Sequence, residues 1–506
     1  MSVSRTVRVL CFVPLVFVLS VSAQAQTTAS ADDSSAPAPA AVNPAPVQKL
    51  FGAFPVATAS ADARKFIEQA FDKYENVQLE DATDLARQAT QKDPNFALGF
   101  ATLSFITRRG TPDTKALARA KSLLPRAASD EQLLVRWMTS VQESDLVPAI
   151  SLMNDLLVRY PKDRHILYLT AEWLYFQQDY DRSREMFERI LKISPDYPPA
   201  LNMLGYAYIE TGVPQPQKAI DSLKRYAEVN PTSPNPEDSL GEVSRYAGQD
   251  EQSLEHYSHA LKIDPTFITS RIGLGDTYTL MSKYDAARAE YDKALKISTN
   301  ARDTLHAKYQ KALTYFWEGK SAQGLETLQN LAAEATQQKD PYAQFEIDFA
   351  RALLTPQVAG QLAQLETLES QFSRQQPGMI ESDRNDDLAA ILRQQARLHS
   401  AAKHFEQAQA AVAKLERLAG ATRDLIVENC YESAEGYLSL AQGNLESAAD
   451  GLSADPQSPL VIFDLTQLQE KLGDASAEST KNRLKYLRAP TLEWFLVTHS
   501  AAAPAS

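Results

Sequence analysis

Two histidines three residues apart, His256 and His259, are the pair in this sequence best placed for metal chemistry. In a helix, a spacing of three puts both imidazoles on one face. A zinc site needs at least three protein ligands, and the neighbouring Glu255 would point about 100° away on the same helix. We therefore predict no metal here, and we expect both imidazoles on the outer, solvated side of their helix.

The tripeptide Gly319-Lys320-Ser321 ends like a phosphate-binding loop. Such a loop also needs a glycine five residues before its second glycine, and this sequence has Thr314 there. The tripeptide also falls between two helical segments, where a turn is expected, and not after a strand. We therefore interpret it as an inter-helix turn and predict no nucleotide site.

An acidic group and a single cysteine are the remaining candidates for a chemical role. The acidic group lacks the glycine and the distal glutamate of a calcium loop, so we assign it to the first turn of a helix, where the dipole favours carboxylates. It comprises Glu381, Asp383, Asp386 and Asp387. Cys430 lies in a helical-looking stretch and is interpreted as a small buried apolar side chain. The sequence thus predicts no catalytic residue, no metal and no cofactor.

Composition sets the class of protein. The 506 residues include 51 Lys and Arg against 64 Asp and Glu, for a net charge of −13, which argues against a basic surface for nucleic acid. A hydrophobic content of 44% with 23% charged residues is typical of a globular chain. Two cysteines are too few for a disulfide scaffold.

The first 25 residues have the three parts of a secretory signal peptide. Arg5 and Arg8 precede a 13-residue apolar run, Val9 to Val21, and Ala23-Gln24-Ala25 supplies the small residues of a cleavage site. Thirteen apolar residues are too few to span a bilayer as a helix, which takes about 20. We predict an exported, soluble protein, periplasmic or extracellular, cleaved near Ala25 and without an integral membrane span in the mature chain.

The residues after the leader predict a flexible tether followed by a long array. Residues 26–60 are rich in Ala, Pro, Ser and Thr, and such a segment buries too little apolar surface to offset its ordering entropy. From about residue 62 a period is visible. Its markers, separated by 34, 36, 34 and 34 residues, are Pro161, Pro195, Pro231, Pro265 and Thr299. A period of about 34 residues with two helical segments indicates a solenoid.

The residues between these markers resemble the tetratricopeptide repeat family. One repeat shows Leu204, Gly205, Tyr208, Ala219, Leu223 and Pro231, and the next shows Leu240, Gly241, Ser253, Tyr257, Ala260 and Pro265. Small residues such as Gly205 would let the two helices of a repeat approach closely, and large ones such as Tyr257 would fill the space between repeats.

The resemblance implies an all-α fold, a right-handed superhelical solenoid of about ten or eleven stacked antiparallel helix pairs. We divide it into an N-terminal array at 61–340, clearest at 164–299, and a degenerate array at 341–499. The latter closes with a capping helix between Tyr486 and Val497, and residues 500–506 form a disordered tail.

The family register also implies a concave groove lined by the first helix of each pair. Aromatic and acidic residues predominate there, which suits a partner protein or peptide segment that is apolar with some positive charge. The groove positions are Tyr168, Glu172, Tyr175, Asn202, Tyr206, Ile209, Asp238, Glu242, Arg245, Asp276, Tyr309 and Phe316.

We therefore predict an exported interaction scaffold or adaptor that binds a peptide or helix segment in this groove. Two alternatives stay open. One is an enzyme with an acidic site in the groove, built from residues such as Glu172, Glu242 and Asp276. It would need a closed pocket with two carboxylates about 5–9 Å apart. The other is a structural subunit of a cell-envelope assembly that binds through its terminal repeats.

Overall fold

The computed structural model describes residues 53–108, 112–455 and 457–500. The predicted leader, residues 26–52 of the predicted tether and residues 501–506 of the predicted tail lie outside the described residues. In the described part the chain forms 25 α-helices and one short 3-10 helix, η2 (Leu124–Arg126).

The α-helices follow one another in the order α1 (Ala61–Glu75), α2 (Leu79–Lys92), α3 (Ala97–Thr107), α4 (Thr114–Leu123), α5 (Ser129–Gln142), α6 (Leu146–Arg159), α7 (Arg164–Phe176), α8 (Tyr180–Ile193), α9 (Pro198–Ile209), α10 (Pro216–Val229), α11 (Asn235–Tyr246), α12 (Asp250–Ile263), α13 (Ile268–Leu280), α14 (Tyr284–Ile297), α15 (Ala301–Trp317), α16 (Ser321–Gln338), α17 (Pro341–Leu354), α18 (Val358–Phe372), α19 (Glu381–Ala401), α20 (Phe405–Thr422), α21 (Leu425–Gln442), α22 (Leu445–Ser453), α23 (Pro459–Leu472), α24 (Ala477–Lys485) and α25 (Leu492–Ser500).

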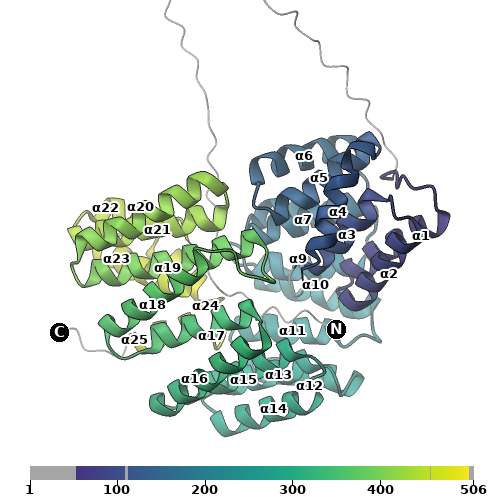
Figure 1. Ribbon diagram of the computed structural model, residues 1–506. Coiled ribbons are helices and arrows are strands. Elements are labelled where there is room, and N and C mark those ends of the chain that lie inside the picture. The colour runs from purple at the N-terminus through teal and green to yellow at the C-terminus, as the bar shows by residue number, and fades with distance from the viewer. Residues whose placement is uncertain (1–52, 109–111, 456, 501–506) are drawn as a thin grey trace, which may run out of the picture.

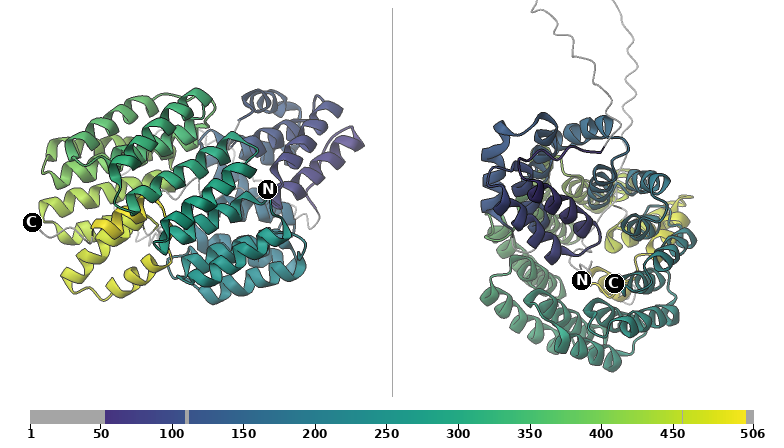
Figure 2. Two further views of the ribbon diagram at one scale, coloured as in Figure 1. Left: turned by 90° about the horizontal axis from the view of Figure 1, so that it is seen from below. Right: turned by 90° about the vertical axis from the view of Figure 1, so that its right-hand side faces the viewer.

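These helices stack as antiparallel pairs, an odd-numbered helix A followed by an even-numbered helix B, with α25 added at the end (Figure 1). The predicted all-α solenoid is confirmed, with roughly a dozen pairs in the described residues. In the right-hand view of Figure 2 the blue, teal and green pairs curve around one axis, and the yellow C-terminal helices lie inside that curve. We call the inner surface formed by the odd-numbered helices the helix-A side.

Helix boundaries in the regular part follow from capping and turn residues. The carboxylate of Asp163 accepts a hydrogen bond from the backbone N–H of Ile166, at 2.9 Å, and so caps α7. Asp179 caps α8 in the same way through the N–H of Arg182. Gly248, between α11 and α12, has a φ of 74°, a left-handed conformation that glycine adopts without strain.

Close approach of the two helices in a pair depends on glycine, as predicted. A methyl group added to Gly275 would lie 2.5 Å from the ring of Tyr291, and one added to Gly241 would lie 2.8 Å from Tyr257. At Gly205 the distance to Leu223 would be 2.6 Å. Distances this short are not tolerated between carbon atoms, so a larger residue would push helix A away from helix B.

The core is a row of local clusters. One cluster joins buried residues between Ala63 and Leu169, a second joins residues between Leu167 and Tyr246, and a third joins residues between Leu305 and Leu398. Each pair thus packs mainly on its neighbours, as expected for a solenoid. Two of the clusters also include residues from the far C-terminus, Ala489 and Leu492, which the repeat pattern does not explain.

The last residues of the segment predicted as tether pack on the array. The backbone N–H of Phe54 donates to the carboxylate of Asp163 at 2.7 Å, and its ring lies 5.3 Å from that of Tyr160. The Thr58 hydroxyl donates to Asp93 at 2.6 Å. The apolar and hydroxyl side chains in this short stretch supply the contacts that the Ala- and Pro-rich residues before it lack.

The first pairs of the array contact its middle part. The hydroxyl of Tyr342, at the start of α17, donates to the backbone carbonyl of Arg108 at 3.3 Å, although 234 residues separate them. The same hydroxyl accepts from the backbone N–H of Ile380 at 3.5 Å. The first pairs of the array therefore contact α17 and the start of α19.

Candidate partner-binding groove

The twelve predicted groove residues all lie on helices A of five consecutive pairs, α7, α9, α11, α13 and α15. Ten of them are buried, and only Glu172 and Glu242 keep part of their side chains accessible, 12% and 15%. The structure therefore brings these residues to neighbouring helices but covers most of them in this conformation.

Hydrogen bonds link these residues from one pair to the next. The Tyr206 hydroxyl of α9 donates to the Glu242 carboxylate of α11 at 2.9 Å. The Ser239 hydroxyl donates to the side-chain oxygen of Asn202 at 2.8 Å. The Tyr175 hydroxyl of α7 donates to the Glu210 carboxylate at the end of α9. We call this series of bonds between successive helices A the inter-repeat ladder. It stabilises the stacking that the glycines permit.

The ladder continues from α11 to α13 through buried charges. The guanidinium group of Arg245 lies 3.5 Å from the Glu242 carboxylate and 3.7 Å from that of Asp276. The Ser270 hydroxyl of α13 donates to Asp238 at 2.6 Å. The Tyr291 hydroxyl donates to Asp276 at 2.8 Å. Arg245 thus pairs with two carboxylates, and the carboxyl of Asp238 near them is bonded to a serine hydroxyl.

Burial is the main cause that shifts the titration of the carboxyls in this cluster. Burial, together with the nearby carboxylates of Glu242 and Asp276, raises the pKa of Asp238 to about 8, against the opposing effects of Ser270 and Arg245. Burial raises the pKa of Asp276 to about 6, opposed by Arg245 and by the Tyr291 hydroxyl. The cluster can therefore hold protons near neutral pH, and it would accept an additional positive charge favourably.

Helix α1 covers the N-terminal part of the predicted groove. The Tyr74 hydroxyl donates to the Glu172 carboxylate at 2.5 Å, and the guanidinium group of Arg108 donates to the Tyr74 hydroxyl at 3.1 Å. Glu75, which is buried, pairs with His165 at 2.5 Å, and its carbonyl accepts from the Tyr168 hydroxyl at 3.3 Å. Two predicted groove residues, Tyr168 and Glu172, are therefore in contact with the protein's own first helix.

The far C-terminus covers the other part. We call residues 483–499 the C-terminal strap. The guanidinium group of Arg483 donates to the carbonyls of Ile209 and Glu210, at 3.4 and 3.0 Å. The ring of Phe495 lies 6.1 Å from that of Phe316, a predicted groove residue. The repeat pattern gave no signal for these contacts, because they join residues at least 179 positions apart.

The two histidines do lie on a partly exposed helix face. The His256 ring is 2.7 Å and the His259 ring 3.0 Å from the carboxylate of Glu237 on α11, a neighbour that the one-helix argument missed. Their side chains are 28% and 54% exposed. Among the described residues no group of three or more His, Cys, Asp or Glu is placed to hold a metal ion.

The other residues that the sequence singled out as candidates for chemistry have structural roles. Gly319 has a φ of 79° and makes the turn between α15 and α16, and the ammonium of Lys320 pairs with Glu318 at 2.6 Å. Glu381 and Asp383 lie in the first turn of α19. Cys430 is fully buried, and burial raises the pKa of its thiol. None of the described helices combines the length and the apolar character of a membrane-spanning segment.

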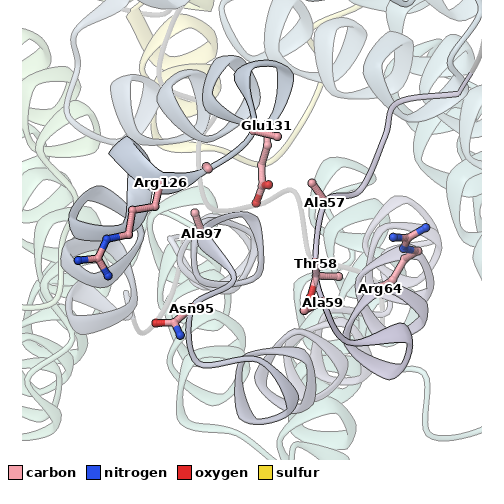
Figure 3. Close-up of a pocket in the computed structure, with 10 residues that line it drawn as sticks. Ala57, Thr58, Ala59, Arg64, Asn95, Ala97, Arg126 and Glu131 are labelled. Atoms are coloured by element: carbon pink, nitrogen blue, oxygen red, sulfur yellow. The ribbon is translucent and has the colours of Figure 1, made fainter.

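A cavity of about 510 Å³ lies away from the ladder, between residues 57–59 and the starts of α3 and α5 (Figure 3). Glu131 points into it, and its carboxylate accepts a hydrogen bond from the backbone N–H of Leu98 at 2.9 Å. Burial raises the pKa of Glu131 to about 6. Arg64 and Arg126 line the cavity but are exposed. The sequence gave no indication of this cavity, because its walls come from a segment predicted as tether and from three separate pairs.

Comparison with known families identifies two of the repeats. Residues 166–197, which correspond to α7 and α8, match a model of the tetratricopeptide repeat, and residues 268–300, corresponding to α13 and α14, match another. These two segments of the chain thus match the tetratricopeptide repeat. Both models describe a repeat unit and neither describes an enzyme. No curated protein matches this sequence at a significant level.

Several solved structures resemble parts of the array. A tetratricopeptide repeat protein from Parabacteroides merdae is 15% identical, with 54% of this chain and 93% of that chain covered and a TM-score of 0.35. A thermophilic TPR protein in Thermus thermophilus is 22% identical over 36% and 96% of the two chains, with a TM-score of 0.31. YrrB, described as a TPR protein with an unusual peptide-binding site, is 18% identical over 44% and 97%, with a TM-score of 0.27.

Proposed function

We propose that this protein is an exported scaffold or adaptor that holds a peptide or helical segment of a partner protein on its helix-A side. Tetratricopeptide repeats typically mediate protein–protein interactions, and solenoids present extended concave surfaces for them. One observation carries the proposal. The helix-A side already contacts a chain segment, the C-terminal strap, through an arginine and an aromatic ring, which are side chains that dominate protein interfaces.

The charge of the helix-A side supports a partner with basic residues. The cluster around Arg245 holds three carboxyl groups, of which Glu242 keeps 15% of its side chain exposed and is the one within reach of a partner. A cationic side chain brought next to Glu242 would be attracted by its negative charge. The proposed partner segment is therefore apolar with some positive charge.

Removal of one charge from this surface tests the proposal. In cross-linked capture from an envelope fraction, we expect Glu242→Gln to retain its partner about tenfold less well than the wild type, the effect of ~1.4 kcal/mol. Glutamine keeps one acceptor oxygen for one of the two tyrosine hydroxyls, Tyr206 or Tyr246, and its NH2 group can donate to the oxygen of the other, so hydrogen bonding across the ladder is retained while the charge is lost.

The matched control is Glu255→Gln, on the exposed face of α12, which makes the same chemical change away from the helix-A side. Capture of the same proteins in the same amounts by the wild type and Glu242→Gln would contradict partner binding on the helix-A side. Loss of capture in the control alone would place binding on the outer helices.

Export is the second part of the proposal, and it depends on residues 1–25. N-terminal sequencing of the purified protein from the periplasm or the medium should give a start near Gln26. A protein that starts at Met1 and stays in the membrane fraction would contradict cleavage.

A further inference from the structure

The C-terminal strap crosses the ends of several helices A in chain order. Its first contact is at the end of α9, its second at the turn from α11 to α12, and its third at the end of α15. In the right-hand view of Figure 2 the yellow C-terminal helices lie inside the curve of the array. The strap is therefore a linear segment laid across successive repeats.

The first contact uses backbone carbonyl groups at a helix end. The last carbonyls of a helix lack partners within it and carry partial negative charge. Arg483 donates to two of them, at Ile209 and Glu210, and also to the Gln457 side chain at 2.6 Å. Arg483 is 2% exposed, and the Gln457 amide also donates to the carbonyl of Glu210, so these two side chains together cover the end of α9.

The second contact is a two-bond ion pair. Both terminal nitrogens of Arg488 donate to the carboxylate of Asp250, the first residue of α12, one of them at 2.8 Å. The two side chains keep 22% and 16% of their surface accessible. A planar guanidinium matches a carboxylate in this geometry, which adds specificity to the charge attraction.

The third contact is apolar and aromatic. Leu492 joins the core cluster that contains Tyr309 and Phe316 of α15. The ring of Phe495 lies 5.4 Å from that of Trp317 in an edge-on arrangement. The strap thus presents an arginine, then a leucine four residues later and a phenylalanine seven residues later, and the last two lie on one face of a helix.

The other side of the strap is attached to the C-terminal part of the array. The Glu493 carboxylate accepts from Arg393 of α19 at 3.0 Å and from the Ser458 hydroxyl at 2.7 Å. Arg393 and Glu493 are 0% and 1% exposed. Water reaches the Arg488–Asp250 pair and the half-buried ring of Phe495 but not Leu492, so these outer contacts can open while the buried attachment holds.

We propose that the ends of α9, α11 and α15 form a binding site for a linear segment with the pattern Arg, Leu at +4 and aromatic at +7, which the strap fills in cis and a partner's segment fills in its place. This proposal rests on the proposed function, and it defines the partner's chemistry. For the residues of this pattern the site supplies a carboxylate at Asp250 and an aromatic surface at Trp317. A tethered ligand competes at a high effective concentration, so a partner gains access only where its segment matches the pattern as well as the strap does.

A labelled synthetic peptide of residues 482–500 is the probe, and fluorescence anisotropy with the full chain is the measurement. Arg488→Glu in the chain breaks the strap's ion pair and leaves the array side unchanged. We expect it to bind the wild-type peptide at least about tenfold more tightly than the wild-type chain does. Lys481→Glu is the control, because Lys481 is exposed and pairs with the exposed Glu470 at 3.3 Å. It should leave the affinity unchanged.

Three results would overturn the proposal. One is a folded Arg488→Glu chain that binds the peptide no better than the wild type. Another is equal binding of a peptide that itself carries Arg488→Glu. A third is a concentration-dependent dimer of the wild-type chain that Asp250→Asn abolishes, which would assign the site to a second copy.

If Arg488→Glu does not fold, Phe495→Ala serves in its place with the same expected gain. The capture experiment changes Glu242, whose bonds to Tyr206 and Tyr246 do not involve the strap. Its outcome is therefore independent of the outcome of the peptide-binding experiment.

Discussion

The region from α7 to α14 and the region from α19 to α25 are both built of antiparallel helix pairs, but different contacts stabilise them. In the first, glycines such as Gly275 allow close packing within a pair, and the ladder joins each helix A to the next, 32 to 37 residues away. In the second, the ion pairs that hold the strap join residues 62 and 100 positions apart.

This difference distinguishes contacts that recur from one repeat to the next from contacts that form only when distant parts of the chain come together. Within the first region the ladder joins only neighbouring pairs and continues the superhelix, and α1 and the strap pack on it from outside this region. The second folds the end of the chain back over the array and so determines which part of the helix-A side is covered. Substitutions in the two regions should therefore have effects of different size and reach.

The largest effect is expected at Arg393, whose fully buried guanidinium group pairs with Asp455 and Glu493. Arg393→Ala leaves two buried carboxylates without their cation, so it should lower the free energy of unfolding by ~3–5 kcal/mol. Urea denaturation followed by circular dichroism measures this. Arg417→Ala, at an exposed position on α20, is the control and should change little. Equal stabilities of both variants would show that the buried charges do not hold the strap.

A smaller loss is expected within the regular region at Gly275. Gly275→Ala places a methyl group 2.5 Å from the Tyr291 ring and should destabilise the chain by ~1–3 kcal/mol, because α13 must move away from α14. Urea denaturation measures the loss in free energy of unfolding. Hydrogen exchange shows which helices are affected, and faster exchange should be limited to the pairs next to α13. A uniform increase of exchange along the whole chain would contradict the local character of this region.

The pH dependence of stability should distinguish the buried carboxyls of the ladder. Because the folded-state pKa of Asp238 is raised to about 8 from an ordinary value of 3.8, the folded state holds a proton that the unfolded state has lost between these values. The stability from this group is present below pH 4 and falls as pH rises, by up to ~1.4 kcal/mol per pH unit.

The check is Asp238→Asn, which removes the titration and keeps an oxygen for the Ser270 hydroxyl. Thermal denaturation between pH 5 and pH 8 should show a smaller decline for Asp238→Asn than for the wild type. A variant whose stability declines as much as that of the wild type over this range would show that Asp238 is ionised throughout and that the ladder does not hold this proton.

The smallest effect is expected at Gly420 of α20, where an added methyl group meets no atom within 4 Å. Gly420→Ala should stabilise the chain by ~0.5–1 kcal/mol, because alanine favours the helix more than glycine does. The same substitution thus has opposite signs at Gly275 and Gly420. A loss of stability at Gly420, measured by the same urea denaturation, would show that α20 contacts another surface there.

The regular region could be predicted because the residues that make its contacts recur at a nearly constant spacing from one repeat to the next. Gly205, Gly241 and Gly275 recur at nearly fixed intervals, and the residue each one faces recurs as well. The placement of the groove residues on helices A followed from the same register. The burial of the groove residues could not be predicted from that register, because it depends on α1 and on the strap, which contact them from distant parts of the chain.

The strap itself carried a weak signal. The stretch from Tyr486 to Val497 was expected to cap the last repeat, since its apolar residues fit an end helix. A helix pattern says which face is apolar and not which surface covers it. The partners of Arg488 and Phe495, Asp250 and Trp317, lie 238 and 178 residues away, and nothing in the local sequence specifies them.

The most direct test of the central claim is hydrogen exchange of the strap in the unmodified full chain. The account predicts that a saturating amount of the peptide of residues 482–500 speeds exchange at backbone amides 487–499, because the added segment takes the place of the strap on α9, α11 and α15. The same amount of a peptide carrying Arg488→Glu should leave these amides protected. Unchanged protection with both peptides would contradict the account and leave the strap as a permanent part of the fold.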